Sequence, residues 1–139
     1  MTRHRHLLAV SAAALTLSVL ALADPIFAAD SGAETYRQNC AQCHGADGRG
    51  NGPEVDTIPG IKPADLTLLS QRHGGKFPFQ EVEDWIDGRK TIPSHKRFDM
   101  PFWGVNLQEP GKEFTPESEA KVKARIDAVV QYLQSIQRE

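Results

Sequence analysis

The stretch Cys40-Ala41-Gln42-Cys43-His44 determines how the rest of this 139-residue chain is interpreted. Its C-x-x-C-H spacing is typical of covalent attachment of a c-type haem. On a helix, Cys40, Cys43 and His44 share one face, because residues three and four apart lie on the same side. Two thiols on one edge can add to the two vinyl groups of a porphyrin, while the imidazole reaches the iron from one side of the ring. The motif therefore predicts one covalently bound haem c per chain.

Other uses of the same residues stay open from the motif alone. A Cys40–Cys43 pair with a lowered thiol pKa would suit a thiol–disulfide oxidoreductase. We find no βαβ pattern around the pair, and the helical period dominates, which favours haem. Zinc fits poorly, because adjacent Cys and His is not the usual spacing of a structural zinc site. A structural disulfide would close a loop too small to stabilise the chain much through entropy.

The N-terminal segment has the pattern of a secretory signal peptide. Residues 1–6 carry Arg3 and Arg5, residues 7–23 are almost wholly apolar, and small-residue cleavage sites end at Ala23 and Ala28. We predict a cleavable leader over residues 1–28 and one domain over residues 29–139. A retained membrane anchor is the alternative, but the apolar run of 17 residues is shorter than the ~20 that a spanning helix usually needs.

Charge and size narrow the class of protein further. The formal net charge is −2, and it becomes −3 once a leader carrying Arg3, Arg5 and Asp24 is removed. This mild acidity gives no sign of nucleic-acid binding. A mature chain of this length can fold alone, but much of it is rich in Gly and Pro, and a large apolar cofactor would complete its core.

Short helices joined by Gly- and Pro-rich loops are predicted for the rest of the chain. Ser31-Gly32-Ala33-Glu34 is a capping-box pattern that predicts a first helix running to about His44. Apolar residues followed by glycine predict short helices near residues 66–69 and 82–87. Thr115 and Pro116 predict the start of a last helix with one apolar stripe. The stripe comprises Val122, Ile126, Val129, Leu133 and Ile136. No segment has a strand period, so the predicted fold is all-α, with four to five short helices and long loops.

A haem iron held by His44 needs a ligand on its other face, and Met100, His73 and His95 are the candidates. We favour Met100, which lies in a loop between residues 92 and 116, because Pro101 restricts its backbone and helps to hold the thioether in place. His95, beside two basic residues, fits a solvated loop. His73, just before two glycines, fits a helix C-terminus.

A set of residues follows the order and spacing of a known family: Gly32, Tyr36, Cys40, Cys43, His44, Gly45, Met100, Pro101, Tyr132 and Leu133. In these positions the chain resembles the class I c-type cytochromes, and its loops look like those of soluble bacterial monohaem members. The resemblance implies a small cytochrome c fold wrapped around one haem, with Gly32 and Tyr36 on a first helix that crosses the last. It also implies a periplasmic one-electron carrier with His44 and Met100 as axial ligands.

The same resemblance implies that the protein is not an enzyme and takes no small-molecule substrate. Its partners would be redox proteins: a dehydrogenase, an oxidase or other cytochromes. A haem sensor or peroxidase-like protein, in which Met100 is displaced from the iron, is the alternative within haem chemistry.

The resemblance further implies that the carbonyl of Pro63 accepts a hydrogen bond from His44, with Pro53 as a competing choice. Leu66, Trp85 and Trp103 are expected to line the haem pocket. A basic cluster lies close to Met100 in the sequence: Arg89, Lys90, Lys96 and Arg97. It would attract acidic partners to the haem edge, or be no more than a solvated loop. Arg89 would alternatively pair with a haem propionate.

Overall fold

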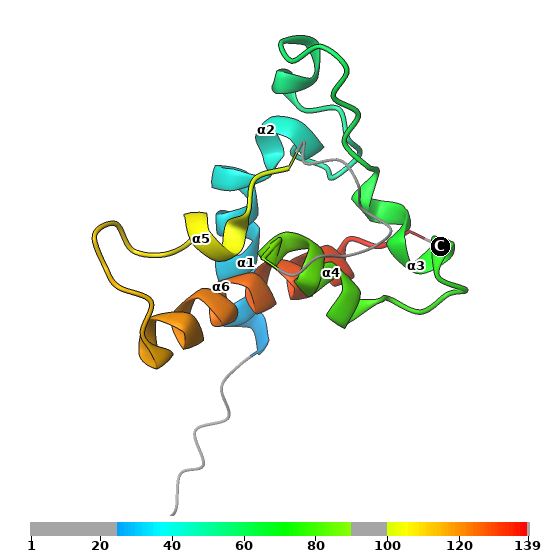
Figure 1. The fold of residues 1–139 in the computed structure, drawn as a ribbon. Coiled ribbons are helices and arrows are strands. Elements are labelled where there is room, and N and C mark those ends of the chain that lie inside the picture. Colours follow the sequence, from blue (N-terminus) through cyan, green and yellow to red (C-terminus); the bar gives the residue numbers. More distant parts are fainter. Residues whose placement is uncertain (1–24, 90–99, 139) are drawn as a thin grey trace, which may run out of the picture.

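The computed structural model describes residues 25–89 and 100–138, and within them the chain is helical with no strand (Figure 1). The α-helices are α1 (Pro25–Asn39), α2 (Ala41–His44), α3 (Leu69–Arg72), α4 (Phe79–Asp87), α5 (Trp103–Asn106) and α6 (Pro116–Ser135). Two 3-10 turns, η1 (Pro53–Asp56) and η2 (Leu66–Leu68), lie between α2 and α3. The all-α prediction is confirmed, with the helical turns more numerous and shorter than expected.

The crossing of α1 and α6 organises the fold. Gly32 is buried where the two helices meet, and a Cβ at that position would overlap the backbone carbonyl of Ala128 in α6. One turn further along α1, Tyr36 is fully buried, and its ring lies 5.1 Å from that of Tyr132, centroid to centroid. The predicted crossing of the first and last helices is therefore confirmed.

The start of the first helix is wrong in the prediction from sequence. The described part of α1 already runs from Pro25, so Ser31 is not the first residue of the helix. The predicted end near His44 holds, although the helix is distorted at Cys40. Hydrogen bonds from Cys40 N to Tyr36 O (2.8 Å) and from His44 N to Cys40 O (2.9 Å) carry the helical pattern from α1 into α2.

The two helices with clear stop and start signals form as predicted. Helix α4 ends at Gly88, which adopts the left-handed conformation (φ 70°) that glycine reaches without steric cost. Helix α6 starts with a capping box in which the Thr115 side chain accepts from Ser118 N (3.2 Å) and the Ser118 hydroxyl accepts from Thr115 N (2.9 Å).

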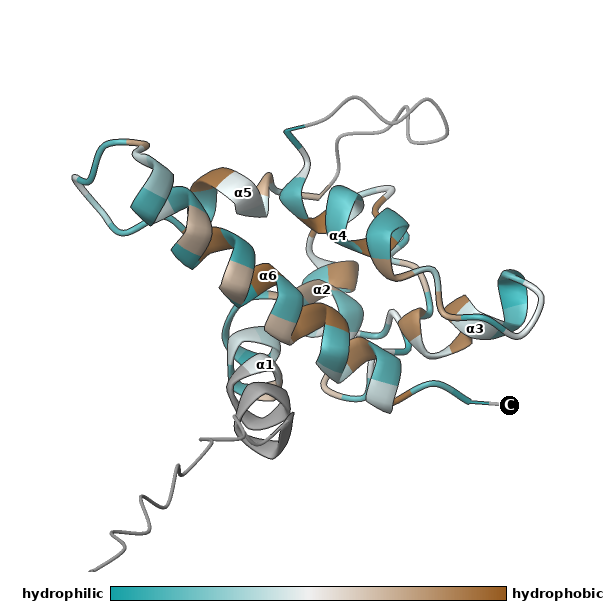
Figure 2. Cartoon of the chain, turned by 90° about the horizontal axis from the view of Figure 1, so that it is seen from below, coloured by the Kyte–Doolittle hydropathy of each residue, from teal (hydrophilic) through white to brown (hydrophobic). Residues whose placement is uncertain are grey.

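The apolar stripe of α6 faces the core, with Val122, Ile126, Val129 and Leu133 each at most 2% exposed. Figure 2 shows this stripe as hydrophobic residues that recur along α6 between hydrophilic ones. Burial of such a stripe is the main source of stability for a helix of this kind. The core cluster comprises Tyr36, Cys40, Leu69, Val82, Ile86, Leu107, Val122, Ile126, Val129, Val130 and Leu133.

Within residues 25–89 and 100–138, no helix has the length and apolar character needed to cross a bilayer.

The close approach at Gly32 generates a stability prediction. Replacing Gly32 by alanine places a methyl group against the Ala128 carbonyl, so α1 and α6 must separate, at a cost of about 1–3 kcal/mol or more in the free energy of unfolding. Chemical denaturation of the haem-loaded protein measures the change. The exposed Gln38→Ala on the same helix is the control and should stay within about 0.5 kcal/mol of the wild type. Equal stability of the two variants would contradict the crossing.

Candidate haem site

The three motif residues lie on one helical turn: Cys40 is the N-cap of α2, and Cys43 and His44 are its last two residues. Cys40 is 8% exposed and belongs to the core cluster, while Cys43 and His44 are half-buried. The two cysteines are not joined as a disulfide. Burial, with a smaller contribution from the neighbouring Cys43, raises the pKa of Cys40 to about 12. Catalytic C-x-x-C pairs have the opposite property, a lowered thiol pKa.

The loop after the motif folds back onto α2. Gly50 N donates to His44 O (2.7 Å) and Gly52 N donates to Cys43 O (3.1 Å), so the last carbonyls of the short helix are satisfied. The Tyr36 hydroxyl in α1 donates to Gly45 O at 2.7 Å. Sequence reasoning named Tyr36 and Gly45 but missed the bond between them, which fixes where the chain leaves the motif.

The His44 ring is oriented by a backbone carbonyl. Its Nδ1 lies 3.1 Å from Ala64 O, and because a carbonyl can only accept, Nδ1 carries the proton. The lone pair is then on Nε2, the nitrogen that an iron-binding histidine needs. Burial lowers the pKa of His44, which keeps the ring neutral, although the bond to Ala64 works in the opposite direction. The donor set of two free thiols and one neutral, oriented imidazole therefore fits a covalently attached haem.

The partner predicted for His44 is wrong by one residue. The Pro63 carbonyl oxygen lies beside Gly50 instead, 2.5 Å from where a Cβ of Gly50 would sit. Gly50 has a φ of +78° and no side chain, which allows this close approach. The next carbonyl, that of Ala64, takes the hydrogen bond. Pro53, the competing choice, lies in η1 and makes no such contact.

The other predicted pocket residues come from three different elements. Leu66 in η2, Trp85 in α4 and Trp103 in α5 are each half-buried and pack against the core cluster that contains Cys40. Met100, just before α5, is half-buried and packs against the same cluster. The structure therefore brings the motif cysteine, the candidate axial methionine and these three side chains to one apolar core.

Comparison with known proteins identifies the family. Residues 27–110, which include the motif and Met100, match the family model described as cytochrome c oxidase, cbb3-type, subunit III. The chain belongs to this family. It is thus a cytochrome c domain that carries a covalently bound c-type haem and functions in haem-based electron transfer. Neither the curated proteins nor the solved structures compared with the chain gave a match.

The rival ligands of the cytochrome c domain are engaged elsewhere or lie outside the described residues. His73 Nδ1 is 2.7 Å from Leu69 O, and its Nε2 is 3.3 Å from a carboxylate oxygen of Glu81. Both ring nitrogens thus have partners, one in α3 and one in α4, and His73 caps the C-terminus of α3, in agreement with the predicted helix-terminal role. His95 lies outside the described residues.

Most of the predicted basic cluster, Lys90, Lys96 and Arg97, also lies outside the described residues. Arg89 makes hydrogen bonds of 2.8 Å to the carboxylates of Asp87 in α4 and Glu119 in α6. These two carboxylates neutralise the guanidinium, so Arg89 joins α4 to α6 in this structure. A contact with a haem propionate would have to compete with both.

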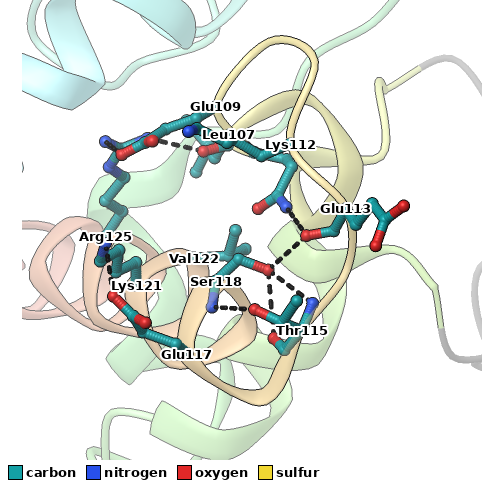
Figure 3. A pocket seen from close by; sticks show the side chains of 11 residues that line it. Leu107, Glu109, Lys112, Glu113, Thr115, Glu117, Ser118, Lys121, Val122 and Arg125 are labelled. Atoms are coloured by element: carbon teal, nitrogen blue, oxygen red, sulfur yellow. Dashed lines mark hydrogen bonds and ion pairs between the residues drawn. The ribbon is translucent and has the colours of Figure 1, made fainter.

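A depression of about 220 Å³ lies between the loop before α6 and the first half of that helix (Figure 3). It is lined mainly by polar side chains, and it contains none of the motif residues. Arg125 closes one side by donating to Leu107 O at 2.7 Å. The depression is therefore separate from the haem chemistry.

Attachment through both thiols generates a spectroscopic prediction. In Cys43→Ser only Cys40 can form a thioether, so one vinyl group stays conjugated with the porphyrin. The band of the reduced pyridine haemochrome is expected to move to longer wavelength than in the wild type. Ala41→Ser, which places a hydroxyl between the two thiols without removing either, should leave the band in place. An unshifted band in Cys43→Ser would show that Cys43 is not attached to the haem.

Proposed function

We propose that this cytochrome c domain is a periplasmic one-electron carrier whose haem iron is held by His44 and Met100. The observation that carries the proposal is the His44 ring, held by Ala64 O with Nε2 left for the iron, on the same helical turn as the two free thiols. When bound, the haem supplies a one-electron couple. The protein supplies fixed ligands, an apolar pocket that excludes water and a docking surface for redox partners.

Met100 is supported as the second axial ligand by its place and its chemistry. Its thioether comes from the segment leading into α5, and it packs beside the cluster that holds Cys40. A Met/His ligand pair raises the reduction potential of haem. With both axial positions filled, the iron has no site for a substrate, and this is the basis for proposing a carrier without catalytic activity.

Export and the choice of partner rest on the N-terminal segment and the family. The n-region, apolar run and small-residue sites of residues 1–28 support a cleaved leader, and residues 1–24 lie outside the described residues. The family description names a subunit of an oxidase. We propose a redox protein as partner, either an oxidase, a dehydrogenase or another cytochrome.

The thiol–disulfide alternative is disfavoured by the surroundings of Cys40. The thiol is buried in the core cluster with a raised pKa, whereas an attacking thiol must be accessible and ionised. The described residues also contain no strand next to which a thioredoxin-like motif would lie.

Substitution of Met100 tests whether its thioether is the second axial ligand. Met100→Ala removes the thioether, and the midpoint potential is expected to fall by on the order of 0.1 V, a fraction of the ~0.8 V range that axial ligands span. The reduced variant should also bind carbon monoxide, which the wild type should resist. Redox titration and absorption spectra measure both changes. His73→Ala and His95→Ala, the rival ligands, should leave the spectrum unchanged.

An unchanged spectrum and potential in Met100→Ala would contradict the ligand assignment. A wild-type protein that is high-spin when oxidised and binds carbon monoxide readily would instead favour a sensor or peroxidase-like protein with Met100 displaced.

A further inference from the structure

The residues that follow α6 are tied to the segment that carries Ala64. Arg138 N donates to Thr67 O (2.8 Å), Arg138 Nε donates to the Thr67 hydroxyl (2.7 Å) and Arg138 Nη2 donates to a carboxylate oxygen of Asp65 (2.8 Å). Thr67 is only 3% exposed, and it is the one buried polar residue in the described part of the chain. The Thr67 hydroxyl also donates to Asp65 Oδ1 (2.6 Å), so the C-terminal residues complete the hydrogen bonds of a buried polar residue.

Gln137 also links the C-terminal residues to the segment that follows Ala64. Its side-chain amide donates to Leu66 O (2.8 Å) and Leu133 O (2.7 Å), and its oxygen accepts from Ser70 N (2.8 Å). One side chain therefore joins the end of α6 to both η2 and α3. All three bonds are partly buried, so water competes for them less than at the surface.

The segment held by these bonds is the one that orients His44. Asp65, the partner of Arg138, directly follows Ala64, whose carbonyl accepts from His44 Nδ1. On its other side the segment is held by the motif loop, because Leu66 N donates to Gly48 O at 2.7 Å. The residues directly after Ala64 are thus held by two anchors, the loop after the motif and the C-terminal residues.

We propose that Gln137 and Arg138 are positioning residues for the iron ligand: they hold the Ala64 carbonyl against His44 Nδ1. This inference rests on the proposed ligation of the iron by His44. A carbonyl that accepts from Nδ1 fixes the tautomer and makes the imidazole a more basic ligand. A more basic ligand favours ferric over ferrous iron and lowers the potential. Loosening this anchor therefore raises the midpoint potential.

The test uses the full haem-loaded protein with Gln137→Ala and Arg138→Ala. Redox titration gives the midpoint potential, and NMR of the reduced protein gives the exchange rate of the His44 Nδ1 proton with solvent. We expect a higher potential in both variants and proton exchange faster by roughly 2- to 10-fold, the equivalent of about one net hydrogen bond. Arg138→Lys, which keeps a charge beside Asp65, should lie between the wild type and Arg138→Ala.

Lys123→Ala is the control for the loss of charge in Arg138→Ala, because it removes one positive charge from the first half of α6. Lys123 pairs with Glu83 and Asp127 and has no bond to the segment of Ala64. If either variant unfolds, Gln137→Met removes the same side-chain bonds while nearly keeping the volume. A potential and exchange rate equal to those of Lys123→Ala, with a lowered melting temperature alone, would overturn the inference. Failure of the proposed function would be recognised separately, by a wild-type spectrum in which His44 is not an iron ligand.

Discussion

The contact on which the rest of the structure depends is the approach of two backbones at Gly32. Because Gly32 has no side chain, α1 can lie directly against the Ala128 carbonyl of α6. The crossing sets the direction of α1, and α1 runs through Cys40 into the candidate haem-binding turn with its helical hydrogen bonds nearly intact. The position of the two thiols relative to the core is therefore set two to three turns before the motif, by a residue that takes no part in the chemistry.

Three further contacts hold His44, the candidate iron ligand, in place. The Tyr36 hydroxyl holds Gly45, the loop amide of Gly50 holds the His44 carbonyl, and Ala64 O holds the His44 ring. Because these come from α1, from the motif loop and from the segment before η2, the ring is restrained from several directions. An electron carrier gains from such restraint, since fixed ligands need little rearrangement when the iron changes oxidation state.

Much of this arrangement was predictable from sequence, and the polar contacts that were not predictable share a physical cause. The end of α4 at Gly88, the capping box at Thr115 and the stripe of α6 follow from local patterns, and the structure has each of them. The acceptor for His44 lies 20 residues away in a loop, where a shift of one residue exchanges Pro63 for Ala64. The bonds of Gln137 and Arg138 span about 70 residues and leave no periodic signal. Single polar contacts over long separations are set by the packed fold, so they become visible only with it.

The match to the family model ends at residue 110, before α6 begins, yet α6 belongs physically to the same domain. It supplies the carbonyl that meets Gly32, the ring that packs on Tyr36 and four side chains of the core stripe. Without α6, Tyr36 and Val82 would expose apolar surface that they now bury, at roughly 25 cal/mol for each Å². A protein cut at residue 110 would keep all the candidate haem ligands and lose the surface that holds them in place. The matched region thus holds the candidate ligands and the hydrogen bonds that orient His44, and α6 supplies the packing that holds α1, and with it the motif, in place.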